Sequence, residues 1–314
     1  MVDGLPIIDV SGEPETFAAE LDRACRDRGF FYVVGHGVDR GLCERVATLA
    51  AEFIARPEAE KAEVAMARGG RAWRGWFGVG DELTSGRPDA KEGLYLGTEL
   101  PPDDRPLHGP NLWPAHPVGL RDAVLEYLDE VVAVGQRVLE GMALALGLDR
   151  TWFRDGLTAD PLVLFRLFRY PPTDSDGWGV GEHTDYGLLT LLWQDDAGGL
   201  EVRSPDGWTA APPVPGSFVC NLGDMLDRMT GGRYRSTAHR AVNRSGRDRY
   251  TFPLFLDPGW DASVAPIPLA DAPPVDDAAT RWDGASVHEV SGTYGEYLLG
   301  KVSKVFPDLV AEVL

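Results

Sequence analysis

The sequence predicts a mainly β protein of the sandwich or barrel type, with helices packed around it. Three observations support this fold class. The second half holds several short apolar segments separated by turn sequences such as Ser-Pro-Asp-Gly at 204–207. Helical periodicity dominates the first half. Hydrophobic residues make up 44% and charged residues 25% of the chain, which is typical of a globular protein. Repeated short strands of this kind favour a β-sandwich or barrel.

The N-terminal part of the chain alternates short strands with helices. Apolar positions spaced as in a helix follow a short opening strand, and Gly29 is a suitable helix end. The apolar and aromatic run 30–34 predicts a buried strand. We therefore expect strands at 6–10 and 30–34, and helices at 16–28, at 40–54 and from Pro57 onward.

Residues 68–117 form a different region, rich in Gly, Pro, Asp and Trp and without sustained periodicity. An irregular stretch of this length inside a compact protein is usually functional. The following residues, 118–146, carry apolar side chains at steps of three, four and seven. They predict a long amphipathic helix that ends near Gly147.

The second half supplies the expected β core. Strands are predicted at 162–168, 188–193, 200–203, 217–221, 238–243 and 250–256, and a final helix at 291–304. We divide the chain into an N-terminal region with the irregular segment (1–117), a long helix with its connector (118–160) and the β core with its final helix (161–314). Together they are expected to form one structural domain.

The charge balance narrows the classes of function. The 314 residues include 30 Lys and Arg against 49 Asp and Glu, a formal charge of −19. This charge argues against nucleic acid and anionic membranes as partners, because both need clustered basic side chains. No apolar run is long enough to span a membrane, and the N-terminus lacks the features of a signal peptide. Three scattered cysteines fit reduced thiols. We expect a cytoplasmic monomer that acts on a small molecule.

Chemistry is concentrated in the β half, where an ordered set of side chains falls on expected strands. His183 and Asp185 stand two residues apart, so their side chains lie on the same side of an extended segment. His239 lies in a later expected strand. Two imidazoles and one carboxylate on one face of a metal leave other positions open, which is the ligand pattern of non-haem Fe(II) oxygenases. Arg249 and Thr251 alternate on one further strand and suit a planar carboxylate.

The sequence resembles the isopenicillin N synthase-like family of Fe(II)/2-oxoglutarate dioxygenases over nearly its whole length. The similar segments are 6–9, 29–38, 170–172, 183–185, 223–224, 236–242 and 249–251. The resemblance implies a double-stranded β-helix, or jelly-roll, core with helices packed around it. It also implies that Fe(II), 2-oxoglutarate and O2 take part in the reaction.

The resemblance assigns roles to six side chains. It implies that the iron ligands are His183, Asp185 and His239, and that the cosubstrate ligands are Arg249, Thr251 and Tyr170. Arg249 and Thr251 would bind the distal carboxylate of 2-oxoglutarate, while the Tyr170 hydroxyl would assist. Plant members often carry Asn two residues before the matching tyrosine, where this chain has Phe168. A phenyl ring donates no hydrogen bond, so the sequence leaves open how the keto-acid end is held.

Substrate contacts are expected at the mouth of such a site. Residues 71–78 resemble a family loop that approaches the active site, and they suggest that Arg74 pairs with a substrate carboxylate while Trp76 or Phe77 stacks on the substrate. The full set of candidates is Arg74, Trp76, Phe77, Arg166, Tyr186 and Phe306. Family analogy suggests oxidation of an unactivated C–H bond in bacterial secondary metabolism or amino-acid modification.

Alternative functions stay open at this point. Hydroxylation is the default outcome, with desaturation or cyclisation as variants. A second hypothesis keeps the iron but not 2-oxoglutarate, as in isopenicillin N synthase, and the pair Arg249 and Thr251 does not separate it from the first. A third is a non-catalytic binding scaffold, although such a scaffold has no need for open metal positions.

Overall fold

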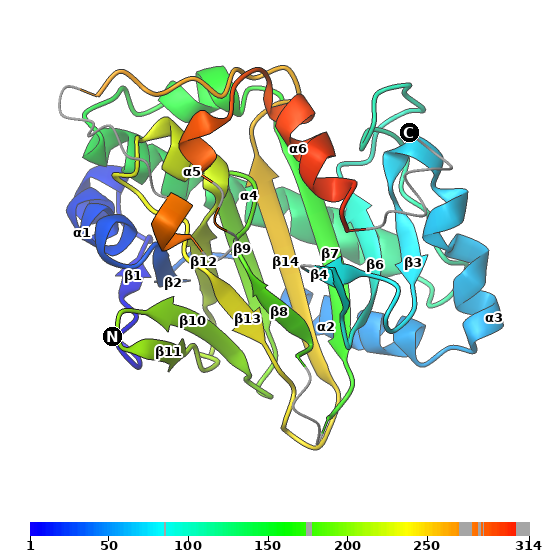
Figure 1. Ribbon diagram of the computed structural model, residues 1–314. Coiled ribbons are helices and arrows are strands. Elements are labelled where there is room, and N and C mark those ends of the chain that lie inside the picture. The colour runs from blue at the N-terminus through cyan, green and yellow to red at the C-terminus, as the bar shows by residue number, and fades with distance from the viewer. Residues whose placement is uncertain (85, 174–177, 270–277, 282–283, 285, 306–314) are drawn as a thin grey trace.

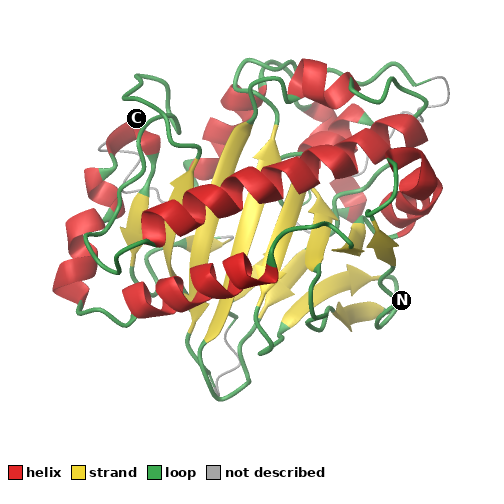
Figure 2. Ribbon diagram, turned by 180° about the vertical axis from the view of Figure 1, so that it is seen from behind, coloured by secondary structure: helices red, strands yellow, loops and turns green. Residues whose placement is uncertain are grey.

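Two β-sheets form the centre of the protein, and helices cover the outer face of the larger one (Figures 1 and 2). The structure is a computed structural model, and it describes all residues except 85, 174–177, 270–277, 282–283, 285 and 306–314. The core is sheet-rich with flanking helices, consistent with the jelly-roll fold that the sequence predicted.

The larger sheet has eight strands and joins both halves of the chain. In spatial order its strands are β1 (Ile7–Asp9), β2 (Phe30–Val34), β12 (Phe218–Leu222), β9 (Leu189–Gln194), β14 (Arg249–Asp257), β7 (Leu162–Tyr170), β6 (Glu92–Gly97) and β3 (Gly75–Phe77). Apart from the parallel pair β1–β2, neighbouring strands run antiparallel. The central strands are buried along nearly their whole length, as expected for a sheet covered on both faces.

A smaller, four-stranded sheet lies against the larger one. Its order is β11 (Gly207–Ala210), β10 (Leu200–Ser204), β13 (His239–Ala241) and β8 (Val180–His183). Strands β8 and β13 lie in front of the large sheet in Figure 1. His183 is in register with His239 across this pair. A third, two-stranded sheet consists of β4 (Leu83–Thr84) and β5 (Arg87–Pro88).

Helices flank the sheets. They are α1 (Pro14–Asp27), α2 (Arg40–Ile54), α3 (Glu58–Lys61), α4 (Leu120–Ala145), α5 (Asp224–Met229) and α6 (Tyr294–Val302). Single helical turns lie at Ala62–Val64, Met66–Arg68, Gly70–Ala72, Phe153–Leu157, Ala278–Thr280 and Val287–Glu289. The long helix α4 crosses the back of the large sheet with α2 beside it (Figure 2). Gly135 allows this close packing, because a Cβ there would stand 2.7 Å from Leu256 Cδ2.

Most of the predicted elements are confirmed, but β3 to β6, β8, β11 and α5 were not predicted. The region 68–117 is not wholly irregular, since β3 and β6 form there and extend the large sheet beyond β7. Strand β8 escaped prediction, because Val180 is its one apolar residue and pairing with β13 is what extends it. Strands β3, β6 and β8 depend on tertiary pairing that local composition does not reveal.

The state of the three cysteines agrees with the reduced thiols that the sequence predicted. Cys25, Cys43 and Cys220 are all buried free thiols. Within the residues described, no helix combines the length and the apolar character that crossing a bilayer requires.

Candidate functional site

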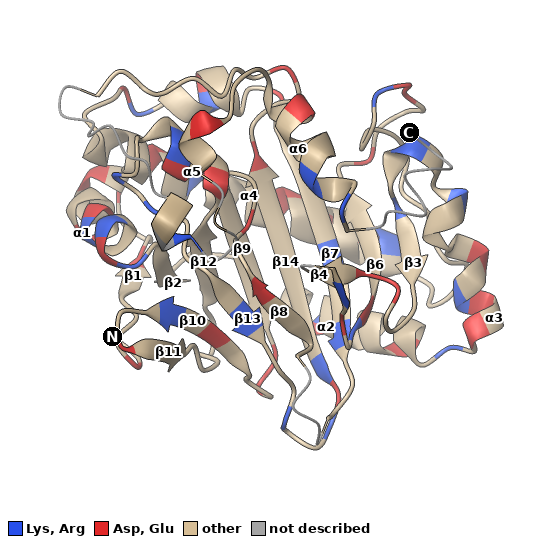
Figure 3. Ribbon diagram, viewed as in Figure 1, with Lys and Arg blue, Asp and Glu red and all other residues tan. Residues whose placement is uncertain are grey.

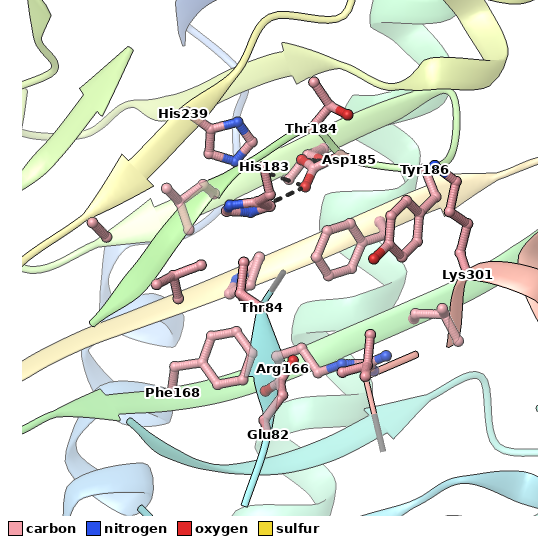
Figure 4. A pocket seen from close by; sticks show the side chains of 18 of the residues that line it. Glu82, Thr84, Arg166, Phe168, His183, Thr184, Asp185, Tyr186, His239 and Lys301 are labelled. Carbon is pink, nitrogen blue, oxygen red and sulfur yellow. Dashed lines mark hydrogen bonds and ion pairs between the residues drawn. The ribbon is translucent and has the colours of Figure 1, made fainter. Parts of the chain in front are cut away.

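A pocket of about 410 Å³ opens between the two sheets, a size suited to a small organic ligand. Its lining residues include members of β2, β6, β7, β9, β12 and β14 of the large sheet, β8, β10 and β13 of the small sheet, β4 and helix α6. Figure 4 shows His183, Asp185 and His239 gathered at one side, with Arg166 and Glu82 at another. All six side chains to which the resemblance assigns iron or cosubstrate roles line this pocket.

The three candidate metal ligands converge on one point. Asp185 Oδ1 lies 3.9 Å from His183 Nε2 and 3.7 Å from His239 Nε2. One ligand atom from each of the three lies within 4.8 Å of the others. The register of β8 with β13 sets the two imidazoles side by side, with ring centroids 4.2 Å apart. Asp185 follows β8 on the turn toward β9.

Backbone carbonyls fix the orientation of both imidazoles. His183 Nδ1 lies 2.8 Å from Gly181 O, and His239 Nδ1 lies 3.2 Å from Thr237 O. A carbonyl only accepts, so the Nδ1 atoms carry the protons and each Nε2 is left with a free lone pair. Phe30 packs its edge against the His239 ring at 5.1 Å. The two rings are therefore held in the tautomer that a metal requires.

Hydrogen bonds to Oδ2 fix the orientation of the Asp185 carboxylate. Its Oδ2 accepts hydrogen bonds from Thr190 Oγ1 at 2.5 Å and Asn221 Nδ2 at 2.6 Å, which leaves Oδ1 toward the imidazoles. Burial acts to raise the pKa of Asp185, but His239, His183 and these two hydrogen bonds outweigh it, so this pKa lies below its ordinary value. The carboxylate is ionised at neutral pH.

Burial raises the pKa of a carboxyl group but lowers that of an imidazole. It lowers the pKa of His183, and it lowers the pKa of His239 to about 4 with the neighbouring His183 as a further cause. Both rings are neutral at pH 7. Two neutral imidazoles and one ionised carboxylate are the protonation states that metal coordination needs.

The turn that carries Asp185 is held by its neighbours. The Asp224 N–H, at the start of α5, donates to Asp185 O at 2.8 Å. A Cβ at Gly187 would stand 1.5 Å from Asp257 Oδ1, so this turn has no room for a side chain there. Asp257 is buried, and its pKa is raised to about 7 by that burial.

The second candidate site lies further along the same pocket. Arg249 on β14 is in register with Tyr170 on β7, and Thr251 is in register with Phe168. The guanidinium lies 4.8 Å from the centroid of the Tyr170 ring. Arg249, Thr251 and Tyr170 are each at most 4% exposed. A guanidinium, a hydroxyl and a phenol thus face one small volume of the pocket.

These residues fit the groups that the sequence implied. Within the described chain Arg249 has no carboxylate within ion-pair distance, and its Nε has no hydrogen-bond partner. A buried cation without an anion is costly unless a ligand supplies one. The His183, Asp185 and His239 donors match the two-histidine, one-carboxylate set of non-haem iron. The pocket is therefore suited to Fe(II) together with a carboxylate ligand.

Phe168 lines the pocket, and a buried lysine lies beside its ring. Lys91 Nζ stands 4.9 Å from the Phe168 centroid. It is paired with Asp89 at 2.5 Å and Glu82 at 3.0 Å. The pKa of Lys91 is raised because these two carboxylates outweigh its burial. Lys91 therefore lies against the side chain at position 168, where plant members often carry Asn.

The predicted substrate residues fall into three groups. Arg166 and Tyr186 line the pocket. Arg74, Trp76 and Phe77 are buried but are not among its lining residues, because β3 pairs with β6 at the edge of the large sheet. Trp76 Nε1 donates to Glu92, and Phe77 packs edge-on against Tyr95. Phe306 lies outside the described residues, so its role stays a prediction.

Several lining residues were missed by sequence reasoning. They are Glu82, Lys91, Thr190, Asn221, Asp257 and Lys301. The last of them, Lys301 on α6, lies 5.6 Å from the centroid of the Tyr186 ring, and both are labelled in Figure 4. The one signal available was the scarcity of lysine: the chain has four, and Lys91, Lys301 and Lys304 all line this pocket.

Two protein-family models match the chain. Residues 5–116 match the model described as non-haem dioxygenase in morphine synthesis N-terminal, and residues 160–258 match the 2OG-Fe(II) oxygenase superfamily. The second match contains all six predicted iron and cosubstrate residues.

Curated relatives cover almost the whole chain. A probable iron/ascorbate oxidoreductase of Dictyostelium discoideum is 45% identical, over 100% of this chain and 98% of the relative. A 1-aminocyclopropane-1-carboxylate oxidase of Dictyostelium mucoroides is 36% identical, over 98% and 97%. A homoarginine-6-hydroxylase of Arabidopsis thaliana is 34% identical, over 96% and 97%.

Solved structures agree with the fold. The crystal structure of a full-length Neurospora crassa protein in complex with alpha-KG superposes with a TM-score of 0.80 at 28% identity, and covers 96% of this chain and 98% of that one. A 2OG-Fe(II) oxygenase family protein of Caulobacter crescentus gives 0.78 at 29% identity, over 96% and 99%.

Proposed function

We propose that this chain, which belongs to the 2OG-Fe(II) oxygenase superfamily, hydroxylates an unactivated C–H bond of a small molecule. The chain is a non-haem Fe(II)/2-oxoglutarate-dependent dioxygenase, and the family uses Fe(II), 2-oxoglutarate and O2. One observation supports the residue assignments: His183, Asp185 and His239 converge in the pocket that also contains Arg249, which forms no ion pair with any described residue.

The iron is assigned to His183 Nε2, Asp185 Oδ1 and His239 Nε2. Three protein ligands on one face leave three positions of an octahedral ion for other molecules. The hydrogen bonds from Thr190 and Asn221 keep Asp185 Oδ2 occupied. They support this assignment, because a carboxylate with one satisfied oxygen presents the other in a fixed direction.

The distal carboxylate of 2-oxoglutarate is assigned to Arg249 and Thr251, with the Tyr170 hydroxyl beside them. Burial lowers the pKa of Arg249 from its high ordinary value, and an anionic ligand reverses that cost. A guanidinium offers parallel donors to a carboxylate, and the Thr251 hydroxyl offers one more.

When bound, Fe(II), 2-oxoglutarate and O2 supply the oxidation: 2-oxoglutarate loses CO2 and becomes succinate, one oxygen atom enters succinate and the other enters the substrate. The chain positions these molecules and keeps water away from them. Val180, Leu192, Leu200 and Phe255 give the pocket apolar surfaces for that purpose.

The substrate class proposed is a free amino acid. The relatives named for 1-aminocyclopropane-1-carboxylate and for homoarginine share 34–36% identity with this chain over nearly its full length. Both of those compounds are amino acids. A role in bacterial secondary metabolism stays a prediction, since these relatives come from slime moulds and a plant. The three-part division of the chain, the cytoplasmic location and the monomeric state also stay predictions.

A second candidate is an iron oxidase that does not use 2-oxoglutarate. The relative named 1-aminocyclopropane-1-carboxylate oxidase is the observation that favours it. The two candidates differ in their products, because only the first forms succinate.

The test is the stoichiometry of the reaction. The iron-loaded protein is given 2-oxoglutarate and O2 with each of a panel of amino acids, and O2 consumption, succinate and oxidised product are measured together. We expect one succinate per O2, and one hydroxylated product per succinate with the true substrate. O2 consumption and product formation without succinate would establish the oxidase instead.

A further inference from the structure

The charged side chains buried in this protein differ in how they are paired. Lys61 pairs with Glu92 at 2.6 Å, and Lys91 pairs with Asp89 and Glu82. The three buried arginines do not follow this pattern. Within the described residues Arg74, Arg166 and Arg249 have no carboxylate within 4 Å. Since the proposed cosubstrate accounts for Arg249, two arginines need an explanation.

Arg166 faces the pocket, whereas Arg74 does not line it. Arg166 lies on β7 in register with Tyr95 of β6, and its guanidinium carbon stands 3.4 Å from the centroid of the Tyr95 ring. Its Nη1 donates to Leu96 O and Phe165 O. The Tyr95 hydroxyl donates to Glu82 at 2.6 Å, which fixes the ring in turn. The guanidinium is therefore held rigidly at the pocket wall, 7% exposed.

The carboxylates nearest to Arg166 in the pocket are engaged elsewhere. Glu82 is paired with Lys91 and accepts from Tyr95. Asp257 accepts from the Tyr294 hydroxyl. Burial lowers the pKa of Arg166 in spite of the attraction of Tyr95, Glu82 and Asp257. The positive charge of Arg166 is thus incompletely compensated by the protein.

The register of the sheet sets Arg166 apart from Arg249 and from the metal ligands. On the same face of β7, Arg166 stands four residues from Tyr170, the register partner of Arg249, or roughly 13 Å at the rise of a strand, and two residues from Phe168, the register partner of Thr251. Thr190, which donates a hydrogen bond to Asp185, lies on β9, and β14 separates β9 from β7. Thr190 is in register with Phe255 of β14, and Phe255 is in register with Leu164 of β7. Both anionic ends of 2-oxoglutarate are used, one at Arg249 and one at the metal. An anion at Arg166 must belong to another molecule.

Two lysines also line the pocket. They are Lys301, on the α6 helix where Figure 3 shows blue, and Lys304 just after that helix; Lys301 Nζ also lies 3.8 Å from Asp224 Oδ2, outside the pocket lining. These lysines stand out in a chain whose formal charge is −19. Basic side chains at the entrance attract an anionic ligand toward the pocket.

We propose that Arg166 binds a carboxylate of the primary substrate and so selects carboxylate-bearing small molecules, with the rest of the substrate directed toward His183, Asp185 and His239. This inference rests on the proposed function and adds a group that determines specificity. In Figure 4, Arg166 lies on the opposite side from the three candidate ligands, and the pocket that all four line has a volume of about 410 Å³.

The experiment compares acids with their amides. Anaerobic protein loaded with Fe(II) and 2-oxoglutarate is titrated in a calorimeter with the twenty proteinogenic L-amino acids, L-homoarginine and 1-aminocyclopropane-1-carboxylate, each paired with its carboxamide. We expect at least one acid to bind, with an affinity at least about tenfold above that of its amide, because charge-assisted hydrogen bonds are lost in the amide. Equal binding of acid and amide, or no binding by any acid of the panel, overturns the proposal.

Three variants at two arginines test whether Arg166 causes the preference for the acid. Arg166→Gln is expected to lose at least about tenfold in affinity for the acid and to abolish the preference over the amide, and Arg166→Lys to keep part of both. Arg74→Gln, which removes an equally buried guanidinium outside the pocket lining, is the matched control and is expected to keep both. An unchanged acid preference in Arg166→Gln, or its loss in Arg74→Gln, contradicts the proposal.

Failure of this inference is distinguishable from failure of the proposed function. Binding of 2-oxoglutarate to the Fe(II) protein is measured in the same samples before any amino acid is added. If 2-oxoglutarate binds to wild type and to Arg166→Gln alike while acids and amides do not differ, the role of Arg166 alone is refuted.

Discussion

The metal-ligand side of the pocket and the Arg166 side are built in different ways. Two segments of the chain, at residues 183–185 and 239, supply the three candidate ligands, and neighbouring groups occupy their remaining polar atoms. The Arg166 side takes side chains from β4, β6, β7 and α6. Coordination of one ion fixes residue types and positions, whereas an organic substrate can be held by many combinations. The first side therefore follows a short motif, and the second does not.

The largest effect on turnover is expected from substitutions of the candidate iron ligands. His183→Ala and Asp185→Ala should abolish turnover, because either change removes one of three iron ligands. Iron content after gel filtration and succinate formation measure this. Glu182→Ala, a change on the same strand at a residue that does not line the pocket, is the control and should keep both. Wild-type activity in His183→Ala would remove the ligand assignment.

A second prediction separates the two guanidinium groups of the pocket. Arg249→Gln should raise the concentration of 2-oxoglutarate needed for half-saturation by roughly 100-fold, since two charge-assisted hydrogen bonds are lost. Arg166→Gln should leave it unchanged. Saturation curves for succinate formation provide the measurement. Equal effects of the two changes on 2-oxoglutarate would mean that the pocket does not have separate anion sites.

A smaller effect on iron binding is expected from a residue that contacts the metal ligand Asp185. Asn221→Ala removes one of the two donors to Asp185 Oδ2, and should weaken Fe(II) binding by roughly tenfold, as loss of such partners commonly does. Competition with a chelator measures the affinity. Thr251→Val should not change it, because Thr251 is assigned to the cosubstrate. An unaltered affinity in Asn221→Ala would show that Thr190 alone orients the carboxylate.

A prediction of a different kind concerns stability and its dependence on pH. Burial raises the pKa of Asp257 to about 7, so the folded protein holds this proton at pH values where the unfolded chain has released it. The stabilising contribution is complete below the ordinary pKa of about 4 and is lost as pH rises through about 7. Asp257→Asn, which cannot ionise, should therefore gain in unfolding free energy relative to wild type over this range, by about 4 kcal/mol at most.

Urea unfolding of wild type and Asp257→Asn at pH 5 and pH 8 tests this prediction. The difference between the two proteins should be larger at pH 8. A difference that does not vary with pH would mean that Asp257 is ionised throughout.

Elements defined by a local sequence pattern could be predicted, whereas elements that depend on non-local pairing could not. The strand at 30–34 and the helix at 40–54 match β2 and α2, because a local apolar pattern defines them. His183 and Asp185 were recognisable for the same reason, since their spacing puts them on one side of the chain. Strand β8 was missed although it carries His183, because its pairing with β13 is non-local.

The Arg166 side could be predicted only in part. Arg166 and Tyr186 were candidates because they adjoin recognisable motifs, and both line the pocket. Glu82 and Lys91 lie in a region without periodicity, and the short β4–β5 hairpin between them brings them together. Arg74 illustrates the reverse case, since an arginine in a suggestive loop is buried away from the pocket lining.

The central claim is that three side chains bind one Fe(II) beside a site for 2-oxoglutarate. Anaerobic titration of the Fe(II)-loaded protein with 2-oxoglutarate tests it most directly, because chelation of iron by the keto acid gives a weak visible charge-transfer absorption. We predict saturation at one equivalent per chain in wild type, a requirement for excess 2-oxoglutarate in Arg249→Gln, and no absorption in His183→Ala. A folded, iron-loaded wild type without this absorption, or a His183→Ala variant that retains it, would contradict the account.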